Sequence, residues 1–79
     1  MKLIILTKKN ILYEGKINSI KVPGKKNCFH ILKNHIPIVT ILSIGKITIY
    51  YRYNEKKIIY LNNEGILELK NNKITILID

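Results

Sequence analysis

Three side chains in this 79-residue sequence are of the types used in metal binding and nucleophilic catalysis. They are Cys28, His30 and His35, in the pattern Cys-x-His-x4-His. A structural zinc site needs four ligands, so the fold would have to supply another, such as the carboxylate of Glu14. Cysteine catalysis needs a lowered thiol pKa, which neighbouring lysines could provide, and a base held by a third group, for which the sequence offers no candidate. We therefore expect no metal, no cofactor and no catalysis here, and we expect Cys28 to be an ordinary loop residue.

His35 precedes the dipeptide Ile36-Pro37, at a predicted corner between two strands. A corner leaves backbone groups without partners, and an imidazole ring can form a hydrogen bond to one of them. The alternative is that the ring lies at an interface with a partner protein. The sequence leaves both roles open.

The cysteine and both histidines lie in residues 22–40, which also contain both prolines of the chain. Pro23 has a fixed φ and Gly24 accepts a positive φ, so this pair predicts a strand that ends in a tight turn. A polar loop tip follows, and the stretch from Phe29 to Leu32 is expected to return to apolar surroundings. The segment is predicted to form two strands joined through a polar loop.

Alternation of apolar and polar residues, rich in β-branched types, runs through the whole chain and predicts an all-β fold. No stretch has a long helical stripe. Eight or nine short strands with frequent turns indicate a sandwich or a small barrel, and we favour a single β-sandwich domain over residues 1–79. The expected strands cover residues 3–7, 11–15, 17–22, 29–32, 38–42, 46–53, 57–61, 66–70 and 74–78.

Four local features can be predicted more finely. Gly15 is expected to supply a bulge or a close backbone approach. Asn71-Asn72 is expected to form a type I′ hairpin turn, because asparagine tolerates left-handed geometry. Glu68 is expected to face solvent, and residues 53–56 to form a hairpin turn. The stretch 46–53 predicts a buried face made of Ile47, Ile49, Tyr51 and Tyr53 and a wet face made of Lys46, Thr48, Tyr50 and Arg52.

The composition limits the classes of protein that fit. A single cysteine excludes an internal disulfide and favours a reducing compartment. The apolar runs are too short for a membrane-spanning helix, and the first residues lack the length and cleavage site of a signal peptide. The net charge of +9 would suit a nucleic-acid partner, but the lysines are spread along the chain and arginine occurs once, at Arg52. A nucleic-acid footprint more often clusters its charge and uses arginine.

Motifs along nearly the whole chain resemble those of one family, the epsilon subunit of F-type ATP synthase, in its amino-terminal domain. The first group is Val22-Pro23-Gly24, Ile31-Leu32, Asn34-His35-x-Pro37, Thr40 and Gly45. The second group is Gly65-Ile66-Leu67-Glu68, Asn71-Asn72-Lys73 and Thr75-Ile76-Leu77. The resemblance implies an all-β fold, a flattened two-sheet β-sandwich of about ten short strands.

The resemblance also implies a function without catalysis. It implies a central-stalk subunit that couples the gamma shaft to the membrane rotor ring of c subunits during ATP synthesis, below the catalytic head. Such a subunit would lie peripherally on the cytoplasmic side of the bacterial inner membrane, as part of the complex. In the family a carboxy-terminal helical hairpin restrains ATP hydrolysis; no such arm follows Asp79 here, and we expect no inhibition of that kind.

Two sets of contact residues are implied by the same resemblance. The residues that match the family's gamma-subunit interface are Thr7, His35 and Thr40. The residues that match its rotor-ring contact loop are Lys25, Lys26, Asn27, Cys28 and Phe29. The family loop is commonly glycine-rich and small or acidic, whereas this loop has two lysines, which would favour an acidic ring surface.

Two rival functions follow from the residues alone. A small basic β-barrel that binds RNA or single-stranded DNA would use the charge and stack bases on the five tyrosines. Tyr50 and Tyr51 are adjacent in a predicted strand, so they point to opposite faces and cannot share one platform. A small metal-dependent enzyme would need the cysteine and both histidines to converge.

Overall fold

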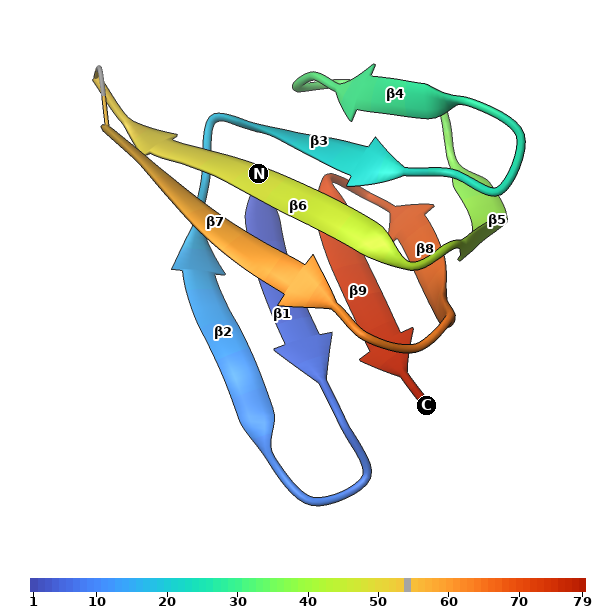
Figure 1. The fold of residues 1–79 in the computed structure, drawn as a ribbon. Coiled ribbons are helices and arrows are strands. Elements are labelled where there is room, and N and C mark those ends of the chain that lie inside the picture. Colours follow the sequence, from blue (N-terminus) through green and yellow to red (C-terminus); the bar gives the residue numbers. More distant parts are fainter. Residues whose placement is uncertain (54) are drawn as a thin grey trace.

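The computed structural model describes residues 1–53 and 55–79, and this part of the chain contains nine β-strands and no helix (Figure 1). The turn predicted at residues 53–56 includes Asn54, which lies outside the described residues. The strands are β1 (Lys2–Leu6), β2 (Ile11–Lys16), β3 (Ser19–Pro23), β4 (Cys28–Ile31), β5 (Ile38–Leu42), β6 (Gly45–Arg52), β7 (Glu55–Leu61), β8 (Gly65–Lys70) and β9 (Lys73–Ile78).

The strands form two sheets that face each other, so the predicted all-β sandwich is confirmed (Figure 1). Sheet A has five strands in the order β2-β1-β9-β8-β5, and sheet B has four in the order β4-β3-β6-β7. Neighbouring strands pair antiparallel, except that β1 and β9 pair parallel in the middle of sheet A. The first and last strands of the chain are therefore neighbours.

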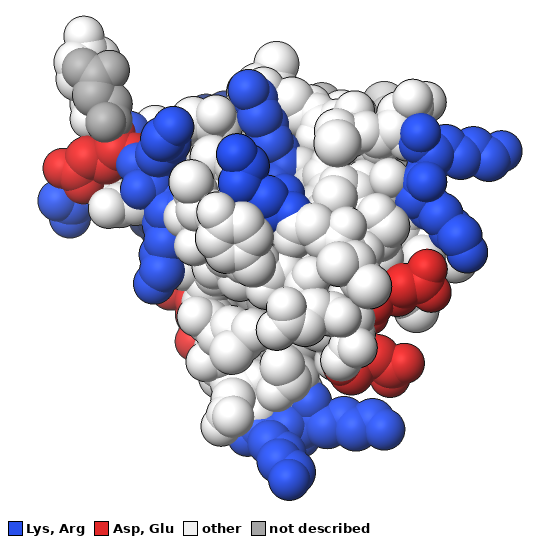
Figure 2. Space-filling view, in the orientation of Figure 1, with Lys and Arg blue, Asp and Glu red and all other residues white. Residues whose placement is uncertain are grey.

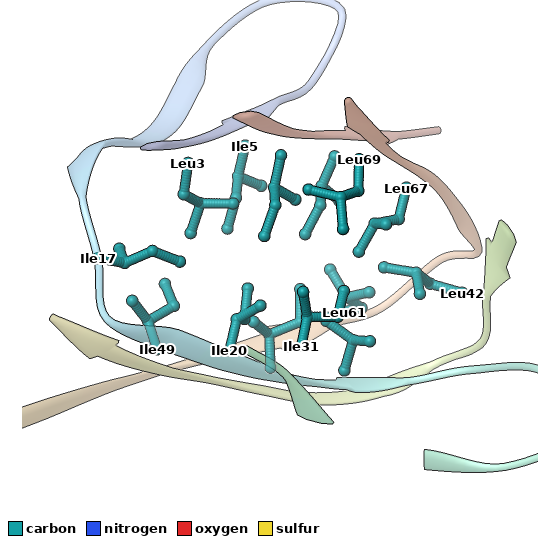
Figure 3. Close-up of a cluster of buried hydrophobic side chains, with 14 of the residues drawn as sticks. Leu3, Ile5, Ile17, Ile20, Ile31, Leu42, Ile49, Leu61, Leu67 and Leu69 are labelled. Atoms are coloured by element: carbon teal, nitrogen blue, oxygen red, sulfur yellow. The ribbon is translucent and has the colours of Figure 1, made fainter. Parts of the chain in front are cut away.

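Aliphatic side chains from both sheets meet between the layers and form one core, as Figure 3 shows. β8 and β9 alternate strictly between buried and exposed or half-buried residues, because one face of each strand meets the other sheet. Tyr13 and Phe29 pack against this core without being fully buried. The fully buried members are Leu3, Ile5, Ile20, Ile31, Leu42, Ile47, Ile49, Leu61, Leu67, Leu69, Ile74 and Ile76.

The turn between β8 and β9 confirms the predicted type I′ hairpin. Asn71 and Asn72 have φ values of 52° and 58°, the left-handed region that both central residues of this turn occupy. The side chain of Asn72 also reaches the loop before β5. Its Oδ1 accepts from the Asn34 amide at 3.0 Å, and its Nδ2 donates to the Asn34 Oδ1 at 3.1 Å.

The predicted faces of β6 are partly wrong. Thr48 is only 6% exposed although it lies on the expected wet face. It pairs with Lys21 on one side and Ile58 on the other, and these longer side chains flank the small threonine in an interior strand. Tyr53 is 89% exposed although it was expected to be buried. The β6–β7 register shifts between Tyr50 and Arg52, and Tyr53 lies beyond the end of β6.

Three further expectations need correction. Gly15 forms no bulge, because the register shift in the β1–β2 pair falls at Leu12. Leu32 is 56% exposed, since β4 ends at Ile31 and Leu32 already belongs to the next loop. Cys28 is the first residue of β4 and not a loop residue.

Gly24 does not have the positive φ that was expected of it. Its requirement for glycine comes from crowding instead. A Cβ atom there would overlap the Asn27 carbonyl oxygen and the Phe29 ring, so the β3–β4 loop folds back closely over this position. At Gly15, by contrast, a Cβ would meet only the Tyr13 side chain, at 3.7 Å or more.

We predict that Gly24→Ala lowers the free energy of unfolding by about 1–3 kcal/mol, because the new methyl group overpacks the loop. Gly15→Ala is the matched control. It should leave stability unchanged or raise it by up to about 1 kcal/mol, because alanine loses less backbone entropy in a strand. Urea denaturation of both variants tests this, and equal losses of stability would contradict the crowding.

Two substitutions at Asn72 separate backbone strain from hydrogen bonding. Asn72→Ala and Asn72→Gly both remove the contacts with Asn34, but only alanine must also adopt a positive φ. Asn72→Ala should therefore be less stable than Asn72→Gly by about 1 kcal/mol. Equal stabilities of the two variants in urea denaturation would show that the left-handed backbone is not the source of the effect.

Candidate partner-binding surface

A groove of about 710 Å³ lies between the β3–β4 loop and the edge strand β5. The loop side consists of residues 24–27 and Phe29, and the strand side consists of Val39, Thr40 and Ile41, with Ile66 from β8. The groove therefore brings one residue of the predicted gamma-subunit set, Thr40, together with four of the five residues predicted to contact the rotor ring.

Backbone hydrogen bonds hold the loop side of the groove against β5. Gly24 forms an isolated antiparallel bridge with Leu42. The Lys25 amide donates to the Ile41 carbonyl at 3.2 Å, and the Ser43 amide donates to the Pro23 carbonyl at 2.8 Å. These bonds tie sheet B to sheet A at this corner, so the loop has a defined position beside the strand.

The groove has an apolar floor and a basic rim. Val39, Ile41 and Ile66 are 71%, 47% and 52% exposed, which are large values for aliphatic side chains. Basic side chains gather at the right of Figure 2, where Figure 1 places the β3–β4 loop, with acidic side chains below them. The Lys25 ammonium lies 3.7 Å from the Glu64 carboxylate, a solvent-exposed pair that contributes at most about 1 kcal/mol. The lining residues include no histidine, cysteine or acid.

An apolar row crosses the outer face of sheet A and ends at the groove. Its members pair side by side in adjacent strands, and we call them the apolar row: Ile11, Leu6, Leu77, Ile66 and Ile41. All but Leu6 are between 47% and 57% exposed. Four lysines form a parallel row at the opposite end of the same face: Lys16, Lys2, Lys73 and Lys70. The outer face is thus apolar at one end and basic at the other.

Thr7 lies at the apolar end of sheet A, directly after Leu6. Its Oγ1 accepts from the backbone amides of Asn10 at 3.0 Å and Lys9 at 3.3 Å. These bonds organise the β1–β2 turn. β9 and β8 lie between β1 and β5, so Thr7 and Thr40 are apart in sheet A, and the apolar row crosses the strands between them.

His35 lies at the opposite end of sheet A. Its neighbour Asn34 contacts Asn72 in the β8–β9 turn, whereas Thr7 lies where β9 ends. The exposed His35 ring forms a hydrogen bond through Nδ1 with the Ile36 carbonyl at 2.7 Å, which confirms the predicted bond to the backbone. The fold therefore does not bring Thr7, His35 and Thr40 into one cluster.

The cysteine and histidines of the Cys-x-His-x4-His pattern are also separated by their contacts. His30 points from β4 toward β3, where its Nε2 lies 2.8 Å from the Ser19 Oγ, and its ring lies 5.6 Å from that of Tyr50. Cys28 is an exposed free thiol. Residues 1–53 and 55–79 contain no group of three His, Cys, Asp or Glu side chains placed to hold a metal ion.

The tyrosines do not form a shared stacking platform. Tyr13 and Tyr51 pack against the core. The pKa of the Tyr13 phenol is raised above its ordinary value, mainly by desolvation and to a smaller extent by the charge of the nearby Tyr51. Tyr50 lies on the outer face of sheet B, with the Lys21 ammonium 5.8 Å from its ring centre. Tyr60 is exposed on the edge strand β7.

Sequence reasoning missed Val39, Ile41 and Ile66 as surface residues. β5 has apolar residues on both faces, and its one polar residue, Thr40, shares a face with buried Leu42, so alternation does not reveal which side of β5 faces out. The start of β8 is apolar on both faces as well. Glu68 could have indicated the exposed face of β8: it is exposed as predicted, and Ile66 two residues earlier shares its face.

In the described part of the chain no helix could cross a membrane.

Comparisons with known proteins agree with this architecture. The family described as "ATP synthase, Delta/Epsilon chain, beta-sandwich domain" matches residues 1–79. The ATP synthase epsilon chain of Leptospira interrogans serovar copenhageni is 39% identical over 79 residues, which are 100% of this chain and 61% of that protein. The plastid ATP synthase epsilon chain of Prototheca wickerhamii is 35% identical and is covered over 58% of its length. The chain thus spans about three fifths of these relatives.

Solved structures show the same fold at low sequence identity. A chain in the Euglena gracilis mitochondrial ATP synthase, OSCP/F1/c-ring, superposes with a TM-score of 0.87 at 14% identity, covering 96% of this chain and 48% of that chain. A chain in the Tetrahymena thermophila mitochondrial ATP synthase central stalk/c-ring gives a TM-score of 0.81 at 13% identity, covering 99% of this chain and 63% of that chain. With the match over the whole sequence, the chain belongs to the family of ATP synthase delta/epsilon-chain β-sandwich domains.

Proposed function

We propose that this chain is the sandwich part of an epsilon subunit in the rotor of an F-type ATP synthase, where it couples the gamma shaft to the membrane ring of c subunits. It does so without catalysis, beneath a catalytic head whose other subunits make ATP. The family match over residues 1–79 and the groove that joins Thr40 to the β3–β4 loop support this proposal. The chain would lie peripherally on the cytoplasmic side of a bacterial inner membrane, through the complex alone.

The mechanism is mechanical. Two hydrogen-bonded sheets packed on one aliphatic core form a body of low compressibility. If gamma holds one surface of that body and the ring contacts a loop at its corner, rotation of one partner moves the other. The backbone bonds between Lys25 and Ile41 and between Ser43 and Pro23 make the corner part of the rigid body.

The outer face of sheet A is the proposed gamma surface. Thr7 follows Leu6 of the apolar row. Thr40 precedes Ile41 at the other end of the row, with its side chain on the opposite face of the edge strand β5, and His35 lies at the far end of the same sheet. An apolar row of half-exposed side chains is the kind of surface that a stable partner buries. The row thus links Thr7 to the edge strand that carries Thr40, whereas His35 lies apart from it.

The loop of Lys25, Lys26, Asn27, Cys28 and Phe29 is the proposed ring contact. Its tip is exposed, while Phe29 is half-buried and anchors the loop to the core. Asn27 and Cys28 therefore project from a fixed base. Such a loop suits contact with the polar turns of a membrane ring.

Loss of one side chain from the apolar row should weaken the gamma complex. Leu77→Ser removes an apolar contact from the middle of the row, and we expect the affinity for the gamma subunit of the same organism to fall by about tenfold. Tyr60→Ser is the control, because Tyr60 is also exposed but lies in sheet B. Isothermal titration calorimetry measures both.

Equal affinities of the two variants would contradict the assignment of this face. The salt dependence of binding provides a second test. The gamma complex should survive moderate salt, whereas a nucleic-acid-binding protein would bind RNA with an affinity that falls steeply, by about one unit of log-log slope for each phosphate contact. RNA binding of that kind without a gamma complex would replace the proposed function.

Cys28 gives a specific test of the ring contact, because it is the single cysteine and is exposed. Labelling it with a bulky maleimide should abolish binding of the chain–gamma complex to the c ring while leaving gamma binding intact. The control carries the same label on Cys28→Ser/Lys56→Cys, on the exposed edge strand β7 of sheet B. Co-sedimentation with purified rings measures binding, and equal behaviour of the two labelled proteins would contradict a ring contact at the β3–β4 loop.

A further inference from the structure

β5 is an edge strand without the usual protection against pairing. The four edge strands are β2, β4, β5 and β7. Natural edge strands are commonly guarded by charges, bulges or short length. β2 contains a bulge, a glutamate and a lysine; β7 contains a glutamate and two lysines; and β4 has four residues and a histidine. β5 reads Ile-Val-Thr-Ile-Leu, with no charge and no histidine.

The backbone of β5 presents unpaired groups at this edge. In an antiparallel pair, the N–H and C=O of one residue point to the same side, and successive residues alternate. The Ile41 carbonyl accepts from Lys25 and not from β8, so Val39 and Ile41 point their backbone groups away from β8. The Ile41 carbonyl is already bonded to the backbone N–H of Lys25. Within the described chain, the N–H and C=O of Val39 and the N–H of Ile41 remain open at this edge.

The groove runs along this edge and not across one face of the sheet. Val39, Thr40 and Ile41 all line it, although consecutive strand residues point to opposite faces. A surface that touches all three must follow the edge of the strand. The groove is therefore placed where an added strand would lie, with Phe29 on its opposite wall.

The charge around the groove indicates what kind of segment fits. Lys25 is paired with Glu64, whereas no ion pair engages Lys26 among residues 1–53 and 55–79. Each chain carries a formal net charge of +9, so repulsion disfavours a second copy of the same chain. A segment with a carboxylate near the lysine end and apolar side chains along the groove is complementary to this surface.

We propose that β5 takes up an extended, carboxylate-bearing segment of the gamma subunit as a sixth strand of sheet A. The segment pairs with the open backbone groups of Val39 and Ile41, places apolar side chains against Phe29, and directs its carboxylate toward Lys26. This inference rests on the proposed function, because Thr40 and the apolar row assign the neighbouring surface to gamma. It adds the mode of binding, which is strand addition.

Hydrogen exchange tests the backbone pairing directly. In the full chain bound to the gamma subunit of the same organism, the amides of Val39 and Ile41 should exchange at least about tenfold more slowly than in the free chain, because new backbone bonds protect them. Val39→Pro removes an outward-facing donor, which edge strands tolerate. It should weaken gamma binding by about tenfold or more, with thermal unfolding confirming that the variant is folded.

A matched pair of double variants tests the carboxylate. Charge reversal at Lys25 and Lys26 can be compared with reversal at two exposed lysines of sheet B, Lys46 in β6 and Lys56 in β7. Lys25→Glu/Lys26→Glu should weaken gamma binding by about tenfold at low salt, and this loss should shrink as salt rises. Lys46→Glu/Lys56→Glu should change the affinity by less than about threefold, because this pair lies outside the proposed gamma surface.

The outcomes separate the two proposals. A chain that forms no complex with gamma overturns the proposed function. A chain that binds gamma with unprotected Val39 and Ile41 amides, or with full affinity after Val39→Pro, overturns strand addition and leaves the coupling function standing. Equal effects of the two lysine reversals overturn the specific carboxylate contact.

Discussion

The packing of two aliphatic faces against each other is the interaction on which this structure depends. The chain has one cysteine and therefore no internal disulfide, and no helix contributes to the core in the part that the structure describes. Isoleucine and leucine from both sheets fill the space between them (Figure 3). Because side chains alternate along a strand, a slip of one residue in any strand would turn its core residues toward water. The core therefore fixes the register of both sheets.

The same packing determines where the sandwich can bind. A two-sheet sandwich has open sides, and the chain closes one of them with the β3–β4 loop, held to β5 by backbone bonds. The loop covers the Leu42 end of β5 and leaves the middle of the strand uncovered. The groove is thus a direct result of how the two sheets are joined at that corner, and its apolar floor continues into the row across sheet A.

Sequence patterns predicted the strands and the fold class well, because alternation is imposed by the core itself. The Asn71-Asn72 turn was predictable for a local reason, since few residues accept two successive positive φ values. The errors at Thr48 and Tyr53 have a different origin. Burial on the outer face of β6 depends on cross-strand neighbours, and the register shift near Arg52 depends on β7. Neither is encoded in the alternation of one strand.

The candidate site was less predictable than the fold. The resemblance assigned the β3–β4 loop and Thr40 separately, and only the tertiary structure places them in one groove. The tertiary structure also shows that Thr7 and His35 lie at opposite ends of sheet A, which spacing in the sequence cannot indicate. Val39 and Ile41 could not be identified as surface residues, because β5 is apolar on both faces and its one polar residue, Thr40, does not lie on the exposed face.

The parallel pairing of β1 with β9 has a consequence for how the molecule is made. The centre of sheet A joins Lys2 to Lys73 and Leu6 to Leu77, contacts that span almost the entire sequence. Such contacts close a long loop and form slowly. During synthesis on the ribosome, β1 emerges long before its central neighbour exists, so sheet A is completed only when β9 has left the exit tunnel.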